Sequence, residues 1–268
     1  MKAKSIFAAT LLVSGLAFGD TASVDTEFVL GVLPYHLDAG QTEALISIPW
    51  IEPGTNDVVG AGVAVTNLVK TAGLTKGDLL LWYDGTGYKS WSIASNEATS
   101  VMYWEPRNVT SKFGSSSTAS NFAALQRGRA LLLQRMNENP AATDIYIVGQ
   151  YTSNAAQTID LGEGSSSDPV RTLIAPPRGV AVDLNENTVV EWSNVGSNDI
   201  IYIRAAEGGL MKAYYRNSEN TAWGCYKMVG ITEVWDDTVT PTIAAGEGAW
   251  YFSRGGRSGS GSTTLTWK

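Results

Sequence analysis

The sequence predicts an all-β protein made of two tandem antiparallel β-sandwich or barrel-like modules that arose by internal duplication. Short apolar runs, such as residues 145–148, 189–192 and 200–203, are rich in β-branched and aromatic residues. Gly, Asn, Asp or Pro bound these runs, which is the pattern of strands separated by turns. Charged residues make up only 17% of the chain, and glycine is frequent, with 28 residues. This composition is typical of extracellular β-proteins with many turns.

The first 19 residues have the pattern of a secretory signal peptide. Lys2 and Lys4 precede an apolar run that ends near Phe18, and small residues, Ala17 and Gly19, precede Asp20. This order of charged, apolar and small residues predicts cleavage after Gly19. The apolar run is shorter than the roughly 20 residues that a membrane-spanning helix needs. We therefore expect a secreted or cell-surface protein that does not insert into the membrane after cleavage.

The net charge of the chain limits its partners. The formal charge is −7, and removal of the two lysines of the signal peptide would make it −9. An acidic surface repels the phosphates of nucleic acids and anionic lipids, so we exclude both as partners.

The two halves of the chain correspond to each other in four segments. Residues 45–49, 77–81, 127–135 and 143–147 match residues 173–177, 198–202, 246–254 and 263–267, in the same order and at offsets between 119 and 128 residues. A repeat at a nearly constant offset predicts a duplicated module. We accordingly expect one β module over residues 20–151, a Ser/Gly-rich linker over 152–171 and a second β module over 172–268.

One segment has a second interpretation. Residues 121–136 are compatible with a helix capped by Asn121, but their counterpart "GEGAWYFSR" has strand composition and glycines. The duplication therefore favours a strand, with a short helix over 122–126 as the alternative. In the second half, the Gly/Ser-rich stretch "GGRSGSGS" predicts a hairpin loop between strands 250–254 and 263–267.

The tetrapeptide "DGTG" at residues 84–87 allows two interpretations. Asp-Gly between strand-like runs predicts a hairpin turn, with Tyr83 opposite Tyr88 and Leu80 opposite Trp91. The tetrapeptide also approaches the Asp-Thr-Gly loop of aspartic proteases, in which two carboxylates share a proton. The extra glycine and the absence of a second Asp-Thr-Gly favour the turn. An acid hydrolase that uses Asp84 with a carboxylate such as Asp199 or Glu207 is the weaker alternative.

Other motifs for catalysis or metal binding are missing from the sequence. His36 is the only histidine, in the predicted bend "LPYHLDAG", and we expect an ordinary surface residue there rather than a member of a catalytic triad. Residues 183–187 begin like a calcium loop but have Thr188 where that loop needs glycine. A polar turn is the favoured interpretation, with a weak calcium site as the alternative. We expect no catalytic residue, no metal and no cofactor.

The only cysteine is Cys225, so the chain cannot form an internal disulfide. Its aromatic neighbours predict a small buried residue rather than a reactive thiol. The acidic pair Asp236 and Asp237 is expected in an exposed turn.

The aromatic residues are the most distinctive feature of the composition. The chain has nine tryptophans and eleven tyrosines, which either fill β-sheet cores or provide flat faces for sugar binding. We expect most of them in the core. The candidates for a ligand-binding patch are Trp82, Trp91, Tyr103, Trp104, Tyr214, Tyr215 and Trp223.

Two stretches carry a resemblance to a known type of module. The first is "EFVLGVLPYHLDAGQTEALISIPW", and the second is "GEGAWYF" at residues 246–252. Together they resemble a duplicated β-rich module of uncharacterised secreted bacterial surface proteins. The resemblance implies a secreted surface or extracellular protein and carries no catalytic consensus. The first copy departs from the pattern, because leucines at 131–133 replace the aromatic triplet.

These observations predict a secreted, non-enzymatic surface or extracellular structural protein. It would act by self-association or by binding a glycan or protein component of a surface. The first alternative is a carbohydrate-binding protein that uses exposed tryptophans and tyrosines, and the second is the acid hydrolase described above.

Overall fold

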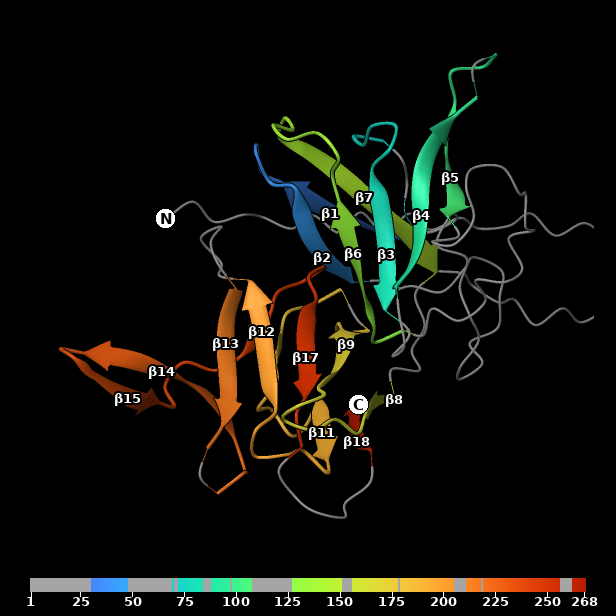
Figure 1. Cartoon of the computed structure of the whole chain (residues 1–268). Helices are drawn as coiled ribbons and strands as arrows, with labels where there is room; N and C mark the ends of the chain where they lie inside the picture. The colour runs from blue at the N-terminus through green and yellow to red at the C-terminus, as the bar shows by residue number, and fades with distance from the viewer. Residues whose placement is uncertain are drawn as a thin grey trace, which may run out of the picture.

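The computed structural model describes residues 30–47, 69, 72–83, 88–96, 98–107, 127–150, 156–177, 179–204, 211–217, 219–255 and 262–268. These residues form strands and turns, with no helix among them (Figure 1), which confirms the all-β prediction. None of them forms a helix with the length and apolar character needed to cross a membrane. The predicted signal peptide, the DGTG tetrapeptide and the possible helix over 122–126 lie outside the described residues.

The first half of the chain forms a sandwich of one large and one small antiparallel sheet. The large sheet has the order β2 (Glu43–Ser47), β6 (Ala130–Gln134), β3 (Leu79–Tyr83), β4 (Tyr88–Ser95) and β5 (Met102–Arg107). The small sheet pairs β1 (Leu30–Leu37) with β7 (Thr143–Gln150). Alternate residues of each strand point inward and build a core that includes Leu37, Ile46, Leu80, Trp91 and Ile145.

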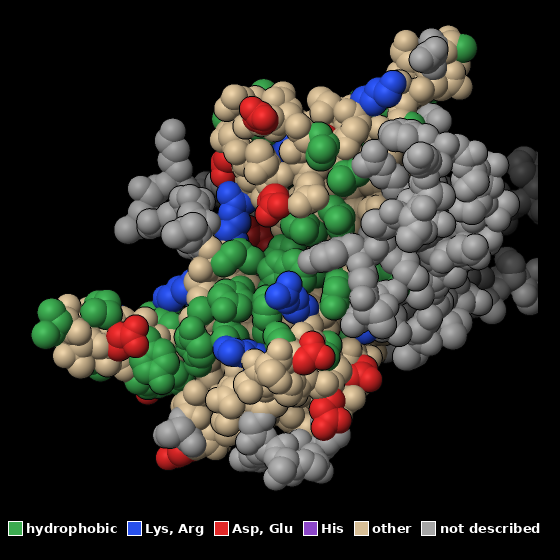
Figure 2. Space-filling model, viewed as in Figure 1, with side chains coloured by type: hydrophobic (Ala, Val, Ile, Leu, Met, Phe, Trp, Pro, Cys, Tyr) green, Lys and Arg blue, Asp and Glu red, His purple; other side chains and the backbone are tan. Residues whose placement is uncertain are grey.

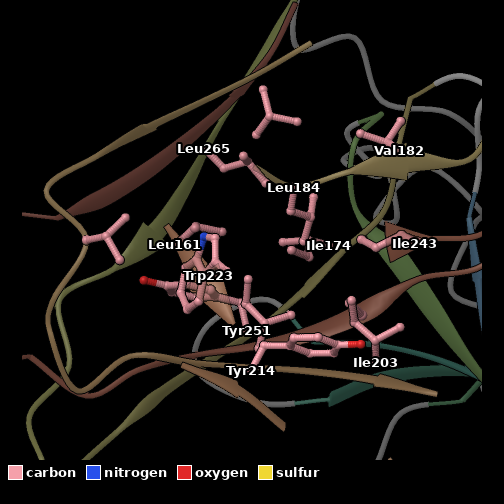
Figure 3. Close-up of a cluster of buried hydrophobic side chains, with 14 of the residues drawn as sticks. Leu161, Ile174, Val182, Leu184, Ile203, Tyr214, Trp223, Ile243, Tyr251 and Leu265 are labelled. Atoms are coloured by element: carbon pink, nitrogen blue, oxygen red, sulfur yellow. The ribbon is translucent and has the colours of Figure 1, made fainter. Parts of the chain in front are cut away.

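The second half forms a similar sandwich with more strands. Its large sheet has the order β15 (Thr232–Asp236), β14 (Trp223–Val229), β13 (Met211–Arg216), β12 (Ile200–Arg204), β17 (Ala249–Ser253) and β9 (Val170–Ile174). The small sheet has the order β11 (Val190–Ser193), β18 (Thr263–Trp267) and β8 (Gln157–Gly162), and β10 (Val182–Asp183) pairs with β16 (Thr242–Ile243). Figure 3 shows the core between them, in which Trp223 and Tyr251 lie among aliphatic side chains.

The large sheets of the two halves have the same strand order. Strands β2, β6, β3, β4 and β5 occupy the places of β9, β17, β12, β13 and β14. The four segment pairs predicted from the sequence fall on β2 and β9, β3 and β12, β6 and β17, and β7 and β18. A common order is what a duplication would produce, and the duplication itself stays a prediction.

The register of the strands corrects one of the predicted segment pairs by a single residue. Leu132 faces Leu45 and Leu81 across the first large sheet, as Trp250 faces Leu173 and Tyr202 across the second. Leu132 therefore corresponds to Trp250, whereas the sequence comparison matches it with Tyr251. A slip of one residue exchanges the two faces of a strand, so the cross-strand register rather than residue similarity determines the match.

Reciprocal hydrogen bonds join the two halves. The end of β2 bonds to the turn before β17, because Ser47 N donates to Gly246 O at 2.7 Å and Gly248 N donates to Leu45 O at 3.0 Å. The end of β9 bonds to the turn before β6, because Ala175 N donates to Gly128 O at 2.9 Å. Both turns contain a glycine with positive φ, +88° at Gly128 and +81° at Gly246.

Buried side chains fill this junction. A third apolar cluster contains Leu45, Leu132 and Leu173, with Trp250 packed against it. Tyr35 of β1 belongs to the first core and lies next to the Gly246 turn: desolvation, followed by the charge of Glu247, raises the pKa of its phenol to about 12. The two sandwiches therefore share buried contacts as well as backbone pairing.

Three local expectations differ from the structure. Strand β8 lies inside the predicted linker, and its alternation of buried and exposed residues pairs it with β18. Residues 250–254 and 263–267 do not form a hairpin, because β17 and β18 belong to opposite sheets of the sandwich. The predicted bend at "LPYHL" is part of β1. Pro34 is tolerated there because, in the described part of the chain, β1 pairs with β7 alone and is an edge strand.

Candidate interaction surface

The outer face of the second large sheet is lined with aromatic rings. Side chains alternate along each strand, so the residues next to the core-facing Ile201, Tyr214 and Tyr251 point to the other face. We call this set the aromatic ladder, and it crosses five adjacent strands. Its members are Trp235, Tyr226, Tyr215, Tyr202, Phe252 and Trp250.

The rings of the ladder contact one another at ordinary aromatic distances. Trp235 and Tyr226 meet edge to face, with ring centroids 5.3 Å apart, and Tyr226 meets Tyr215 in the same way at 5.6 Å. Across the sheet, Tyr202 and Phe252 form an edge-to-face pair at 5.0 Å. Such pairs contribute about 0.5–1.5 kcal/mol each beyond the area that they bury. The ladder is therefore an ordered face rather than a set of separate rings.

A glycine makes room for the outermost tryptophan of the ladder. Gly224 of β14 lies opposite Tyr215 of β13, and a Cβ atom on Gly224 would be 2.6 Å from Cζ2 of Trp235. The indole therefore lies directly over the glycine backbone. This close approach sets the position of Trp235 at the edge of the sheet.

The last two strands of this sheet project from the molecule as a hairpin. We call the segment from Trp223 to Asp236, which contains β14 and β15, the hairpin arm (Figure 1). Gly230, with φ +66°, and Ile231 form its two-residue loop between the paired residues Val229 and Thr232. Glycine at the first position of such a loop matches the twist of a hairpin.

The hairpin arm exposes large apolar side chains along most of its length. Figure 2 shows these side chains as an apolar projection at one end of the molecule. The exposed fractions are 97% for Ile231, 61% for Met228, 56% for Val229, 51% for Tyr226 and 41% for Val234. Contiguous exposed apolar surface is uncommon on soluble monomers and marks interaction sites.

Polar contacts fix the base of the arm. Asp236 accepts hydrogen bonds from the hydroxyl of Thr238 at 2.5 Å and from its backbone N–H at 3.1 Å, and it lies 3.1 Å from Nζ of Lys227. The Thr238 hydroxyl, and then Lys227, hold the pKa of Asp236 below its usual value. On β13, the guanidinium of Arg216 lies 4.9 Å from the ring centre of the buried Trp223. The arm therefore projects from a fixed base.

The structure separates the predicted aromatic candidates into core and surface residues. Trp91 and Trp104 lie in the first core, and Tyr214 and Trp223 lie in the second, where no ligand on the surface can stack on them. Trp82 packs against the first core and is partly buried. Tyr103 lies on β5, and its side chain is outside the described part of the structure. Tyr215 alone belongs to the aromatic ladder.

Sequence reasoning missed the other five members of the ladder and the whole hairpin arm. One signal was present in "YKMVGITEVW", where apolar residues occupy both faces of the hairpin around its Gly-Ile turn. A hairpin that packs one face on a core normally has polar residues on the other face. This segment departs from that pattern, because apolar residues occur on both of its faces.

A pocket of about 260 Å³ lies beside Trp192 of β11. The indole is partly buried, stacks on Tyr251 with centroids 5.7 Å apart and donates from Nε1 to the Leu184 carbonyl at 2.9 Å. Hydrogen-bonding side chains surround it, and Lys268 pairs with Glu191 at 2.9 Å on its wall. The polar residues of the lining are Asn185, Asn187, Glu191, Arg216, Thr221 and Lys268.

The hydrogen bonds of Asp199 give it a structural role in the second module. This buried carboxylate accepts hydrogen bonds from Gly196 N at 2.7 Å, Arg254 N at 2.6 Å, Gly255 N at 3.2 Å and the Tyr251 hydroxyl at 2.5 Å. Burial, followed by the charge of Asp199, raises the pKa of Tyr251 well above its ordinary value.

Asp78 has the corresponding position before β3. Its carboxylate is also buried, and it accepts hydrogen bonds from Thr75 N and Met136 N, each at 2.9 Å. Both aspartates thus connect a turn to the end of a neighbouring strand. The remaining acid-hydrolase candidates, Asp84 and Glu207, lie outside the described residues.

The other polar candidates also have local partners. His36 lies at the surface of β1, with Nδ1 2.7 Å from Oδ1 of Asp144 on β7. In the polar turn after β10, the amide of Asn185 exchanges two hydrogen bonds with the backbone of Trp223, at 2.9 Å and 2.8 Å. Cys225 is a buried free thiol, as predicted. In the described part of the chain, no three His, Cys, Asp or Glu side chains gather as a metal site would require.

Comparison with protein-family models, with curated proteins and with solved structures found no significant match.

Proposed function

We propose that the protein is a secreted, non-enzymatic surface or extracellular structural protein that acts by self-association through the hairpin arm. The observation that carries this proposal is the exposure of Ile231, Met228 and Val229 on a projecting hairpin with a fixed base. Covering these side chains removes apolar area from water, which contributes about 25 cal/mol per Å². This favourable free energy is gained only when a partner covers the arm.

The order of the arm further supports an interaction role. Its rings form a connected ladder with Tyr215, so Tyr226 and Trp235 already hold defined positions in the absence of a partner. A preorganised apolar surface loses less conformational entropy on binding than a flexible loop. Trp and Tyr are also the residue types enriched at the centres of protein interfaces.

Sedimentation velocity over a range of protein concentrations tests this proposal. We expect the purified protein to form assemblies that the double variant Met228→Ser, Ile231→Ser does not form. The matched control is Val101→Ser, Met136→Ser, which removes two exposed apolar side chains from the first module. Assembly should persist in this control. A wild-type protein that remains monomeric at high concentration, or an arm variant that assembles normally, would contradict the proposal.

The pocket beside Trp192 favours carbohydrate binding as a second candidate function. A partly buried indole surrounded by amide, carboxylate and cationic groups suits a polyhydroxylated ligand, which needs one stacking face and several hydrogen bonds. Isothermal titration against a panel of soluble oligosaccharides would test this candidate. We expect binding that Trp192→Ala abolishes and Trp82→Ala leaves unchanged. Absence of heat with every sugar would remove the candidate.

A further inference from the structure

We propose that two copies of the chain associate by antiparallel pairing of their β15 strands, centred on Val234. This inference rests on the proposed function and adds the partner, a second copy, and the mode of contact. Strand β15 is the terminal strand of the second large sheet, so among the described residues one of its edges has no neighbouring strand. A free edge presents backbone N–H and C=O groups that another strand can pair with.

The hairpin geometry indicates which backbone groups face outward. A two-residue loop is closed by a hydrogen-bonded pair, here Val229 and Thr232, and hydrogen-bonded and non-hydrogen-bonded pairs then alternate along the strands. The backbone of Val234 therefore bonds inward, to Lys227. The backbone groups of Glu233 and Trp235 point to the free edge, where they are available to a partner strand.

The edge lacks several of the usual features that prevent strand addition, although it carries the acidic side chains of Glu233 and Asp236. Proteins protect free edges with charged side chains, especially lysine, and with proline, bulges or very short strands. Strand β15 reads Thr-Glu-Val-Trp-Asp, pairs with β14 without a register shift and contains neither proline nor lysine. Its side chains therefore leave the backbone edge open to a second strand.

Charge selects one register among the symmetric pairings of two β15 strands. Centring on Glu233 would place two glutamates directly opposite each other. Centring on Trp235 would place Glu233 opposite Asp237 at both ends. Centring on Val234 places Thr232 opposite Asp236 and Glu233 opposite Trp235, so no like charges face each other. Like charges directly opposite each other destabilise strand pairs, which favours the register centred on Val234.

This register also satisfies the outward-facing backbone groups. Glu233 and Trp235 of each copy become hydrogen-bonded pairs, while the two Val234 residues form a non-hydrogen-bonded pair with Cα atoms about 4.5 Å apart. The same contact serves both copies, which makes the interface isologous and closes it as a dimer. The aromatic ladder of each copy then ends at the shared contact, where Trp235 lies opposite Glu233 of the other copy.

A second copy fits the arm better than a lipid surface does. Glu233 lies opposite Met228, one pair from the loop, so insertion of the apolar tip into a bilayer would carry this carboxylate with it. The chain as a whole carries a net charge of −7, which opposes approach to anionic lipids. Strand pairing leaves the Glu233 side chain at the sheet surface, in contact with water.

Disulfide trapping of the full chain tests the register. In Val234→Cys the Cα atoms of the two cysteines would be about 4.5 Å apart, inside the roughly 4.4–6.8 Å range of Cα–Cα distances that a disulfide needs. We expect mild oxidation with copper phenanthroline to convert most of this variant to a covalent dimer. The matched control is Thr232→Cys, on the same face of β15. In this register its Cα atoms are roughly 14 Å apart, and it should remain monomeric on denaturing gels.

Further controls separate the possible failures. Wild-type protein, in which Cys225 is buried, should not cross-link. Efficient cross-linking of Thr232→Cys, or none of Val234→Cys, would overturn the proposed pairing. If arm-dependent assembly persisted in sedimentation while Val234→Cys failed to cross-link, the pairing would be wrong and the proposed function would stand. A monomeric protein that binds phosphatidylcholine vesicles through Ile231 would overturn both.

Discussion

Replacement of Asp199 by asparagine tests how the second module is held together. The carboxylate is buried and accepts hydrogen bonds from Gly196 N, Arg254 N, Gly255 N and the Tyr251 hydroxyl. In Asp199→Asn, the amide oxygen can keep the bonds from Arg254 and Gly255. The amide NH₂ then faces Gly196 N–H and the tyrosine hydroxyl, where it adds a donor to a site that needs an acceptor.

The expected loss of stability follows from these contacts. The tyrosine hydroxyl can rotate and accept, but Gly196 N–H cannot, and a buried donor without a partner costs about 1–3 kcal/mol. The two bonds that remain lose the contribution of the negative charge, which amounts to about 1 kcal/mol each. We therefore expect Asp199→Asn to lower the free energy of unfolding by about 4 kcal/mol.

Urea unfolding at neutral pH measures this loss, and two matched variants calibrate it. Asp78→Asn removes one of two acceptor positions in the equivalent buried site, and should cost about 3 kcal/mol. Asp160→Asn changes an exposed carboxylate that accepts from Gly162 N, and should cost less than about 0.5 kcal/mol. If Asp199→Asn were no more destabilising than Asp160→Asn, the structural role assigned to Asp199 would be wrong.

Three more predictions concern other parts of the fold. In Gly224→Ala, the new Cβ would lie 2.6 Å from Trp235 Cζ2, and we expect a loss of about 1–3 kcal/mol in urea unfolding with a shift in tryptophan fluorescence; an unchanged spectrum would contradict the packing. Burial and Glu247 raise the pKa of Tyr35 from 10.0 to about 12, so this phenol contributes stability below pH 10 that is lost as the pH rises toward 12. The loss is about 3 kcal/mol, and the stability of Tyr35→Phe should be flatter over this range; parallel pH profiles for the two proteins would contradict this prediction. The Thr238 hydroxyl lowers the pKa of Asp236 below 3.8. The ionised carboxylate therefore stabilises the folded protein fully above pH 3.8, and this stabilisation is lost as the pH falls through the lowered pKa. Circular dichroism should therefore show greater acid sensitivity in wild type than in Asp236→Asn, and equal sensitivity would contradict the role of this carboxylate.

The sequence was sufficient to predict the fold class because β-strands leave local signals. Alternation, turn residues and aromatic composition identified the hairpin in which Leu80 faces Trp91 and Tyr83 faces Tyr88, as the structure has it. Pairing between distant strands has no local signal. The sequence therefore could not predict that β17 and β18 lie in opposite sheets, or that the edge position of β1 tolerates Pro34.

The interaction surface was harder to predict because composition does not distinguish a buried ring from an exposed one. Trp223 and Trp235 both lie near the base of the hairpin arm, yet the first is in the core and the second is on the outer ladder. Their faces depend on the register between β13, β14 and β15, which the sequence does not specify. The surface also depends on the arm extending beyond its module, which is a property of the tertiary structure.

Hydrogen–deuterium exchange of the full chain at low and high protein concentration tests the association of the arms most directly. The outward-facing amides of Glu233 and Trp235 should exchange rapidly at low concentration and become protected as the concentration rises. The Val234 amide, which bonds inward to Lys227 within one copy, should be protected at both concentrations. Protection that does not change with concentration at Glu233 and Trp235, or that increases only at sites outside the hairpin arm, would contradict the account.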